Sequence, residues 1–130
     1  MLKFGYTLFY VDDVEQSISF YKNAFGLEPG FVDKENKQYG ELITGSTKLG
    51  FVHHRTASSH GFQYERSGLE KNPFAIEIGF ITEDVQAFFD KAVAAGAMPV
   101  SKPQKKPWGQ TVCYVRDLNG FLVELSSPMN

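Results

Sequence analysis

The stretch that decides the fold is Trp108-Gly109-Gln110-Thr111-Val112-Cys113-Tyr114-Val115-Arg116-Asp117-Leu118-Asn119-Gly120-Phe121-Leu122-Val123-Glu124-Leu125. Two runs rich in β-branched and aromatic residues flank its Asp117-Leu118-Asn119-Gly120 segment, whose Asp, Asn and Gly tolerate the left-handed backbone of a tight turn. The pattern predicts a β-hairpin with strands over residues 110–116 and 120–126. Because side chains alternate along a strand, Glu124 points away from the face that carries Val123 and Leu125. Its carboxylate is either a rim charge or a ligand in a cavity.

Composition sets broad limits. With 130 residues, of which 42% are hydrophobic, the chain is long enough for one compact domain that buries about two-thirds of its unfolded surface. A net charge of -2 and the lack of a basic helix or stripe argue against nucleic-acid binding. No run approaches the roughly 18 apolar residues of a membrane helix, and the N-terminus opens directly into a strand pattern, so we expect a soluble, cytoplasmic protein. The lone Cys113 lies inside a predicted strand, which favours a buried hydrophobe over a nucleophile.

The first half of the chain has a β-α-β-β-β pattern. Residues 4–11 are almost continuously apolar, as in a strand covered on both faces. Apolar residues then recur at helical spacing over residues 13–25, with Asp13 as N-cap and Gly26 just past the end. Three short strands follow, over residues 28–32, 38–44 and 48–53.

The second half repeats this pattern after an irregular polar connection over residues 54–72. We predict a strand over residues 74–81 and a helix from Val85 that Gly96 ends. Three more strands are expected over residues 98–102, 110–116 and 120–126. The chain is therefore predicted to be a single domain over residues 1–130, with module 1 at about 3–53 and module 2 at about 73–127.

The two modules can be placed in register. Residues 9–14 superpose on residues 80–85 with the same acidic pair before the helix, which makes Tyr6 equivalent to Glu77. In the closing strands, residues 47–51 correspond to 121–125, which pairs Gly50 with Glu124. One helix on each sheet leaves the opposite face open, so we expect an α+β fold whose tandem modules form a curved, antiparallel-rich mixed sheet with helices outside and an open trough. These four positions would line the trough.

These features resemble the vicinal oxygen chelate superfamily over essentially the whole chain. The resemblance rests on the doubled β-α-β-β-β pattern, on Val11-Asp12-Asp13-Val14 and Phe20-Tyr21 with Phe25-Gly26-Leu27 in the first module, and on the closing hairpin with Glu124-Leu125. The superfamily includes glyoxalase I, extradiol dioxygenases, fosfomycin-resistance thiol transferases and bleomycin-resistance proteins. The chain looks closest in type to the bleomycin-resistance members.

The resemblance also implies where a metal would bind. In metal-dependent members the four trough positions carry His, Gln or Glu ligands, whereas this chain has Tyr6, Gly50, Glu77 and Glu124 there. A catalytic divalent site normally keeps about three protein ligands. We therefore expect no metal and no other cofactor; if a divalent ion binds, its ligands would be Glu77 and Glu124, with Glu41 as a third oxygen donor.

The other reactive side chains give no catalytic pattern. His53 and His54 are adjacent in sequence and would point to opposite faces of a strand, and His60 lies in the irregular connection, so we expect all three to be solvated polar residues. The chain has no G-x-S-x-G nucleophile elbow and no Gly-rich phosphate cradle before a helix. The sequence identifies no catalytic residue.

The bleomycin-resistance type implies a trough that holds a flat, hydrophobic or cationic ligand between aromatic walls. Alternation or family position places the following candidate ligand-binding residues on or beside the trough: Tyr6, Leu8, Phe51, Glu77, Trp108, Tyr114 and Glu124. Aromatic faces combined with desolvated carboxylates favour planar or cationic molecules.

Two functions remain open from the sequence. The first is a small-molecule-binding, sequestering protein that forms a homodimer. The alternative is a metal-dependent glyoxalase I-like lyase, isomerase or extradiol dioxygenase-like oxidoreductase, in which Glu77 and Glu124 are ligands and Tyr6 is an acid. The absence of good ligands at Tyr6 and Gly50 favours the binding protein.

Overall fold

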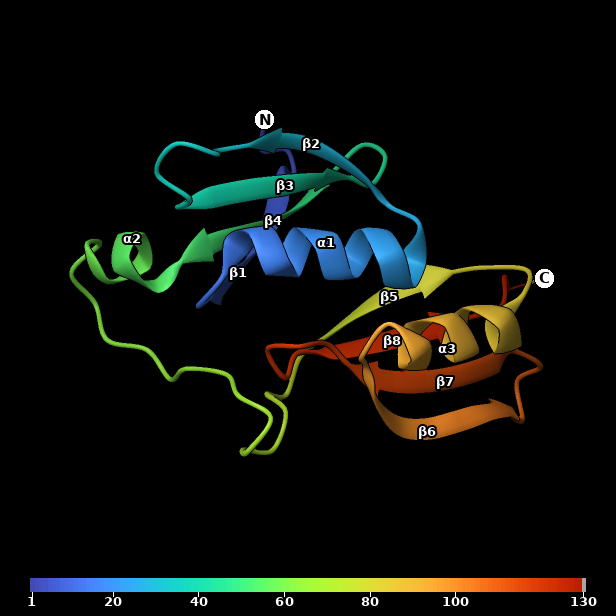
Figure 1. Ribbon diagram of the computed structural model, residues 1–130. Helices are drawn as coiled ribbons and strands as arrows, with labels where there is room; N and C mark the ends of the chain where they lie inside the picture. The colour runs from blue at the N-terminus through green and yellow to red at the C-terminus, as the bar shows by residue number, and fades with distance from the viewer. Residues whose placement is uncertain (130) are drawn as a thin grey trace. The chain divides into compact units, whose positions relative to one another are not determined.

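The computed structural model describes residues 1–129 and divides into two compact units, each of which is described by itself (Figure 1). Unit 1 comprises residues 1–22 and 26–66, and unit 2 comprises residues 23–25 and the chain from residue 67 onward. The elements of the first half are β1 (Tyr6–Val11), α1 (Val14–Phe25), β2 (Glu28–Val32), β3 (Tyr39–Ile43), β4 (Lys48–His53) and α2 (His54–Ser58). Those of the second half are β5 (Glu77–Ile81), α3 (Val85–Ala94), β6 (Met98–Lys105), β7 (Thr111–Arg116) and β8 (Leu122–Ser126).

The sheet of unit 1, sheet A, has the strand order β1-β4-β3-β2. β1 runs parallel to β4, and the other two pairs are antiparallel. Its core lies beneath α1, where the ring of Phe51 meets Tyr21 at a centroid distance of 5.2 Å and Phe9 at 6.2 Å. Burial of these rings on one face holds the helix on that face and leaves the other uncovered.

The caps of α1 follow the sequence pattern. Asp13 precedes the helix, and its side chain accepts a 2.9 Å hydrogen bond from the backbone N–H of Gln16. Gly26 follows the helix with a φ of +71°, and its N–H donates to the carbonyl of Lys22. Only glycine adopts this left-handed conformation without steric cost, so the helix ends where the sequence predicts.

The sheet of unit 2, sheet B, repeats the arrangement with the order β5-β8-β7-β6 and a parallel β5–β8 pair. α3 packs on β6, β7 and β8. The core of this unit includes the fully buried residues Cys113, Val115 and Val123. The prediction of a buried, unpaired Cys113 is confirmed.

The register predicted between the modules is confirmed by the strand pairing. In sheet A, Tyr6 pairs with Lys48 and, two residues on, Leu8 pairs with Gly50. In sheet B, Glu77 pairs with Leu122 and, two residues on, Gly79 pairs with Glu124. Tyr6 therefore occupies the place of Glu77, and Gly50 occupies the place of Glu124.

The hairpin between β7 and β8 is also confirmed. One carboxylate oxygen of Asp117 accepts 2.9 Å hydrogen bonds from the backbone N–H groups of Asn119 and Phe121. Gly120 has a φ of +91°, as the turn chemistry requires. The buried Arg116 donates to the carbonyls of Gly120 at 2.9 Å and Gly68 at 3.1 Å, which ties the turn to the preceding connection.

The three largest differences from the prediction lie in β5, in the connection between the modules and in β6. β5 begins at Glu77 rather than at residue 74, and the helix α2 lies inside the connection expected to be irregular. β6 continues to Lys105 rather than ending at residue 102, because Pro103 is tolerated on an edge strand whose pairing is interrupted there. Within residues 1–129, no helix has the length and apolar character needed to cross a membrane.

Candidate functional site

An acidic cluster of Glu77, Tyr114 and Glu124 lies on the face of sheet B opposite Val123 and Leu125. Tyr114 and Glu124 stand directly opposite each other across β7 and β8, and the Tyr114 hydroxyl donates a 2.8 Å hydrogen bond to Glu124 Oε2. Gly79 pairs with Glu124 on the other side of β8, so Glu77, two residues before Gly79, shares this face. The strand register alone brings the three side chains together.

The cluster holds an exchangeable proton. Hydrogen bonding to Glu124, together with partial burial and the negative charge of Glu124, raises the pKa of Glu77 to about 7. The hydrogen bond to Glu124 also raises the pKa of Tyr114 to about 12. Near neutral pH the two carboxyl groups therefore share a proton for part of the time, while Tyr114 stays protonated and acts as a donor.

Sheet B has room beside the cluster. A Cβ atom built on Gly79 would meet no atom within 4 Å. Gly79 is exposed, and it lies next to Glu124 in the sheet. A ligand group can therefore approach the backbone of β5 between the side chains of Glu77 and Glu124.

The equivalent face of sheet A carries a cluster with its charges already paired. Glu41 accepts a 3.0 Å hydrogen bond from the Tyr39 hydroxyl at Oε1 and forms a 2.8 Å ion pair with Lys48 Nζ at Oε2. The bond from Lys48 lowers the pKa of Glu41, and burial, followed by the bond to Glu41, raises the pKa of Tyr39 to about 12. Both oxygens of Glu41 are thus occupied.

Gly50 leaves no space for a ligand side chain at its position. A Cβ atom there would lie 2.8 Å from Leu8 Cδ2, 3.2 Å from the Gly40 carbonyl oxygen and 3.3 Å from the Tyr39 hydroxyl. Leu8 therefore packs beside Gly50 on the open face of sheet A. Tyr6, at the start of β1, is 62% exposed.

The donor set does not fit a catalytic divalent metal. Residues 1–129 contain no group of three or more His, Cys, Asp or Glu side chains gathered to hold an ion. Sheet B offers two carboxylates whose shared proton competes with a metal, and Glu41 in sheet A is held by Lys48. A zinc-type site needs about three protein ligands, with imidazole or thiolate among the favoured donors. We derive no chemical step through a metal.

Two of the sequence-predicted ligand residues, Phe51 and Trp108, do not belong to the acidic cluster. The expectation for Phe51 is corrected: its ring is fully buried beneath α1, because it is adjacent to Gly50 and so faces the other side of the strand. Trp108 is 60% exposed in the turn between β6 and β7. Its indole N–H donates a 2.8 Å bond to Gln110 Oε1, and no hydrogen bond or ring contact within residues 1–129 joins it to the acidic cluster.

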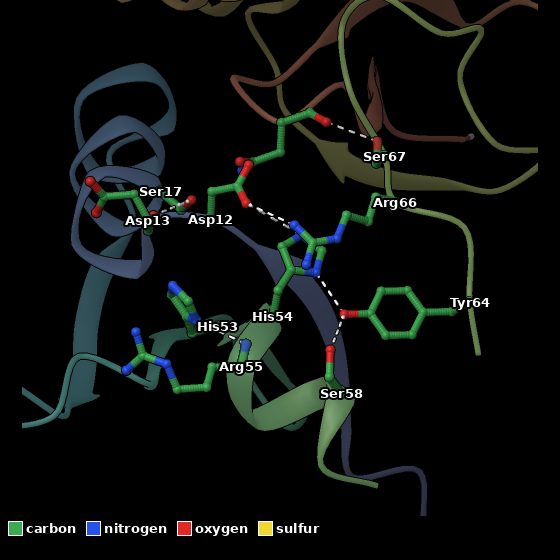
Figure 2. A network of polar contacts seen from close by, with 11 residues as sticks. Asp12, Asp13, Ser17, His53, His54, Arg55, Ser58, Tyr64, Arg66 and Ser67 are labelled. Atoms are coloured by element: carbon green, nitrogen blue, oxygen red, sulfur yellow. Dashed lines mark hydrogen bonds and ion pairs between the residues drawn. The ribbon is translucent and has the colours of Figure 1, made fainter. Parts of the chain in front are cut away.

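The expectation for His54 is also corrected. The residue is 4% exposed, and its Nδ1 lies 2.7 Å from the hydroxyl of Tyr64, whose ring stacks on the imidazole (Figure 2). Its Nε2 lies 3.9 Å from Asp12 Oδ1, to which Arg66 Nη1 approaches at 3.5 Å. Burial, followed by the charge of Arg66, lowers the pKa of His54. The aromatic Tyr64 inside a polar connection was the sequence signal for this buried partner.

Comparison with known proteins agrees with the fold described above. A family model described as Glyoxalase/Bleomycin resistance protein/Dioxygenase superfamily matches residues 3–125. The uncharacterized protein YraH of Bacillus subtilis (strain 168) is 27% identical over 118 residues, which cover 88% of this chain and 90% of that protein.

Solved structures agree as well. A glyoxalase-related enzyme from Fulvimarina pelagi has a TM-score of 0.83 at 18% identity, with 98% of this chain and 89% of that chain covered. A lactoylglutathione lyase from Agrobacterium tumefaciens has a TM-score of 0.70 at 23% identity, with 98% and 94% covered. TioX from Micromonospora sp. ML1 has a TM-score of 0.72 at 21% identity, with 97% and 98% covered. At these identities the likeness concerns the fold.

Proposed function

Because this chain belongs to the Glyoxalase/Bleomycin resistance protein/Dioxygenase superfamily, we propose that it is a small-molecule-binding protein that sequesters a planar, cationic ligand at the acidic cluster of sheet B. The resemblance drawn from the sequence is confirmed at the level of the superfamily. The sequestering function, the class of ligand and a cytoplasmic setting form the proposal.

The observation that carries the proposal is the arrangement of Glu77, Glu124 and Tyr114 around the open space at Gly79. A ligand ammonium or amidinium group can donate to both carboxylates, and charge-assisted bonds of this kind are about twice as strong as neutral ones. The Tyr114 hydroxyl fixes Glu124 from the side, so the acceptor is held in place before the ligand arrives.

Aromatic surface supports the planar part of the proposal. Trp108 belongs to the same unit as the acidic cluster and is more than half exposed. Exposed aromatic rings attract planar cations by stacking and by cation–π interaction, each worth about 0.5–1 kcal/mol at such sites.

The proposal is tested by calorimetric titration with 4-aminoquinoline and 9-aminoacridine, planar molecules that are protonated at neutral pH and carry N–H donors, with quinoline-2-carboxylate as the anionic match. We expect micromolar binding of the cations, weakened about tenfold or more by Glu124→Gln. Gly79→Leu fills the open space and should also weaken binding. Glu83→Gln, which removes an exposed carboxylate of the same unit, is the matched control and should bind as the native protein does.

Two results would reject the proposal. One is equal affinity for the cations and for quinoline-2-carboxylate. The other is an unchanged cation affinity when Glu77 and Glu124 are both replaced by Gln. Trp108 is the only tryptophan, so a change in the emission of the native protein on titration reports contact between the ligand and this indole. If the indole stacks on the ligand, Trp108→Ala should also weaken the binding measured by calorimetry.

A metal-dependent lyase, isomerase or dioxygenase is the second candidate. It is favoured by the pKa of Glu77, which at about 7 suits a group that gives and takes a proton near neutral pH. Elemental analysis after dialysis separates the two functions. About one zinc, nickel, manganese or iron ion per chain, lost in Glu124→Gln, would favour the enzyme, whereas a binding protein should carry no stoichiometric metal.

A further inference from the structure

A polar cavity of about 300 Å³ lies in unit 1, and none of its lining residues belongs to the acidic cluster of sheet B. It is placed where the parallel strands β1 and β4 end and α1 begins, and its charged or titratable lining residues are Asp12, Asp13, Glu15, Lys37, His53 and Arg55. This volume is at the lower end of the range of about 300–1,000 Å³ for small-molecule pockets. The cavity therefore suits a small polar ligand.

Some of the charges around the cavity are already balanced. Lys37 Nζ lies 3.6 Å from Glu15 Oε1, and Arg66 Nη1 lies 3.5 Å from Asp12 Oδ1. Lys37 reaches this place from a backbone with a φ of +59°, the one positive φ among the non-glycine residues described. A lysine in the left-handed region costs free energy, so other interactions of the loop must stabilise the backbone of Lys37 in this conformation.

Two donors on the cavity wall have no such partner. The Nδ1 atom of His53 accepts a 2.9 Å hydrogen bond from the backbone N–H of Arg55, so the neutral ring carries its proton on Nε2. Within residues 1–129, neither this Nε2 atom nor the Arg55 guanidinium has a hydrogen-bond or ion-pair partner. Figure 2 shows both side chains on the same side of the network as Asp13.

Asp13, another lining residue, offers an acceptor. Asp13 uses one carboxylate oxygen to cap α1, where it accepts the 2.9 Å bond from Gln16, and its second oxygen is without a partner among residues 1–129. Gln38, which also lines the cavity, is held in place, since it accepts a 2.7 Å bond from the Thr56 hydroxyl and donates a 3.1 Å bond to the Asn36 carbonyl. The cavity lining thus includes a guanidinium group and a carboxylate oxygen that have no partner among residues 1–129.

We propose that this cavity binds a free α-amino acid as its zwitterion. The ligand carboxylate is bound by the Arg55 guanidinium and His53 Nε2, and the ligand ammonium group is bound by Asp13. A simple anion would meet the carboxylates of Asp13 and Glu15, and a simple cation would meet Arg55 and Lys37, so a molecule with both charges fits best. The site is independent of the acidic cluster on sheet B.

The test is a titration of ¹⁵N-labelled protein with each of the twenty amino acids, with propionate and ethylamine as single-charge matches of alanine. We expect at least one amino acid to shift the amide resonances of residues 13, 37 and 55 saturably, and the two single-charge compounds to bind at least tenfold more weakly. Arg55→Gln and Asp13→Asn should each weaken binding about tenfold. Asn is itself a good N-cap, so Asp13→Asn removes the charge and keeps the helix start.

His53→Asn provides a further variant, because its side-chain oxygen can still accept from the backbone N–H of residue 55 while the Nε2 donor is lost. Glu124→Gln is the matched control and should leave amino-acid binding unchanged. The proposal is overturned if no amino acid gives saturable shifts at these residues, if propionate binds as tightly as alanine, or if Arg55→Gln has no effect.

Discussion

The hydroxyl oxygen of Tyr39 lies 3.3 Å from the point that a Cβ atom on Gly50 would occupy. The same point is 2.8 Å from Leu8 Cδ2. At the position where the superfamily resemblance implies a metal ligand, this chain therefore has two neighbouring side chains packed against bare backbone. The loss of the ligand is built into the packing of sheet A and is not a single substitution that could be reversed.

Replacing Gly50 by Ala should destabilise the protein by about 1–3 kcal/mol, because the added methyl group overpacks the contact with Leu8 and the Gly40 carbonyl. Gly79→Ala is the matched control, since a Cβ atom there meets no neighbour within 4 Å. Its effect should stay within about 0.5 kcal/mol. Urea denaturation measures both, and equal effects of the two variants would contradict this account of Gly50.

The proton on Glu77 should make stability depend on pH. The pKa of Glu77 is raised from 4.5 to about 7 in the folded protein, so between these values the folded state binds more protons than the unfolded state. The contribution is fully present below about pH 4.5 and is lost as the pH rises through 7. As the pH rises from 5 to 8, the melting temperature of Glu77→Gln should therefore increase relative to that of the native protein. A constant difference across this range would contradict it.

His54 should make stability depend on pH in the opposite direction. Its pKa is lowered in the folded protein from 6.5, first by burial and then by Arg66, so the unfolded state takes up protons more readily as the pH falls below this value. The free energy of unfolding should decrease from about pH 6.5 downward, and His54→Asn should remove part of that slope. His60→Asn, at an exposed site, should leave the slope unchanged.

We propose that the protein is a homodimer, as its superfamily resemblance suggests. Apolar side chains on the edge strands support this, since Phe31 on β2 is 64% exposed and Val100 on β6 is 51% exposed. Sedimentation equilibrium should give twice the chain mass of 14.6 kDa. A monomer at concentrations of about tens of micromolar would contradict the proposal.

Much of the fold could be predicted from strand periodicity and turn residues. The Asp117–Gly120 turn and the acidic pairs before the two helices were enough to place both modules, and the superposition of Tyr6 on Glu77 holds in the strand pairing. Alternation also placed Glu124 away from Val123, and the fold then set it opposite Tyr114.

The predictions for His54 and Phe51 were wrong for different reasons. His54 is buried because Tyr64, ten residues later, folds back onto it. An aromatic residue in a polar connection signals a buried contact, but no local pattern specifies that its partner is His54. Phe51 was assigned to the ligand set although its neighbour Gly50 was placed on the trough and alternation puts adjacent strand residues on opposite faces. The hydrogen bond between Glu77 and Glu124, which sets the chemistry of the site, required the register of two strands to be known.

Alkylation of the buried Cys113 can report local unfolding of unit 2. Burial raises the pKa of this thiol to about 11, and Cys113 lies on the face of β7 opposite Tyr114, where α3 packs, so an alkylating reagent can reach the sulfur only after sheet B has separated from α3 or its strands have parted. Cys113 is the only cysteine in the chain. The rate at which the native protein is alkylated therefore measures how often unit 2 opens in this way, and a ligand that binds its closed form should slow that rate in proportion to its occupancy.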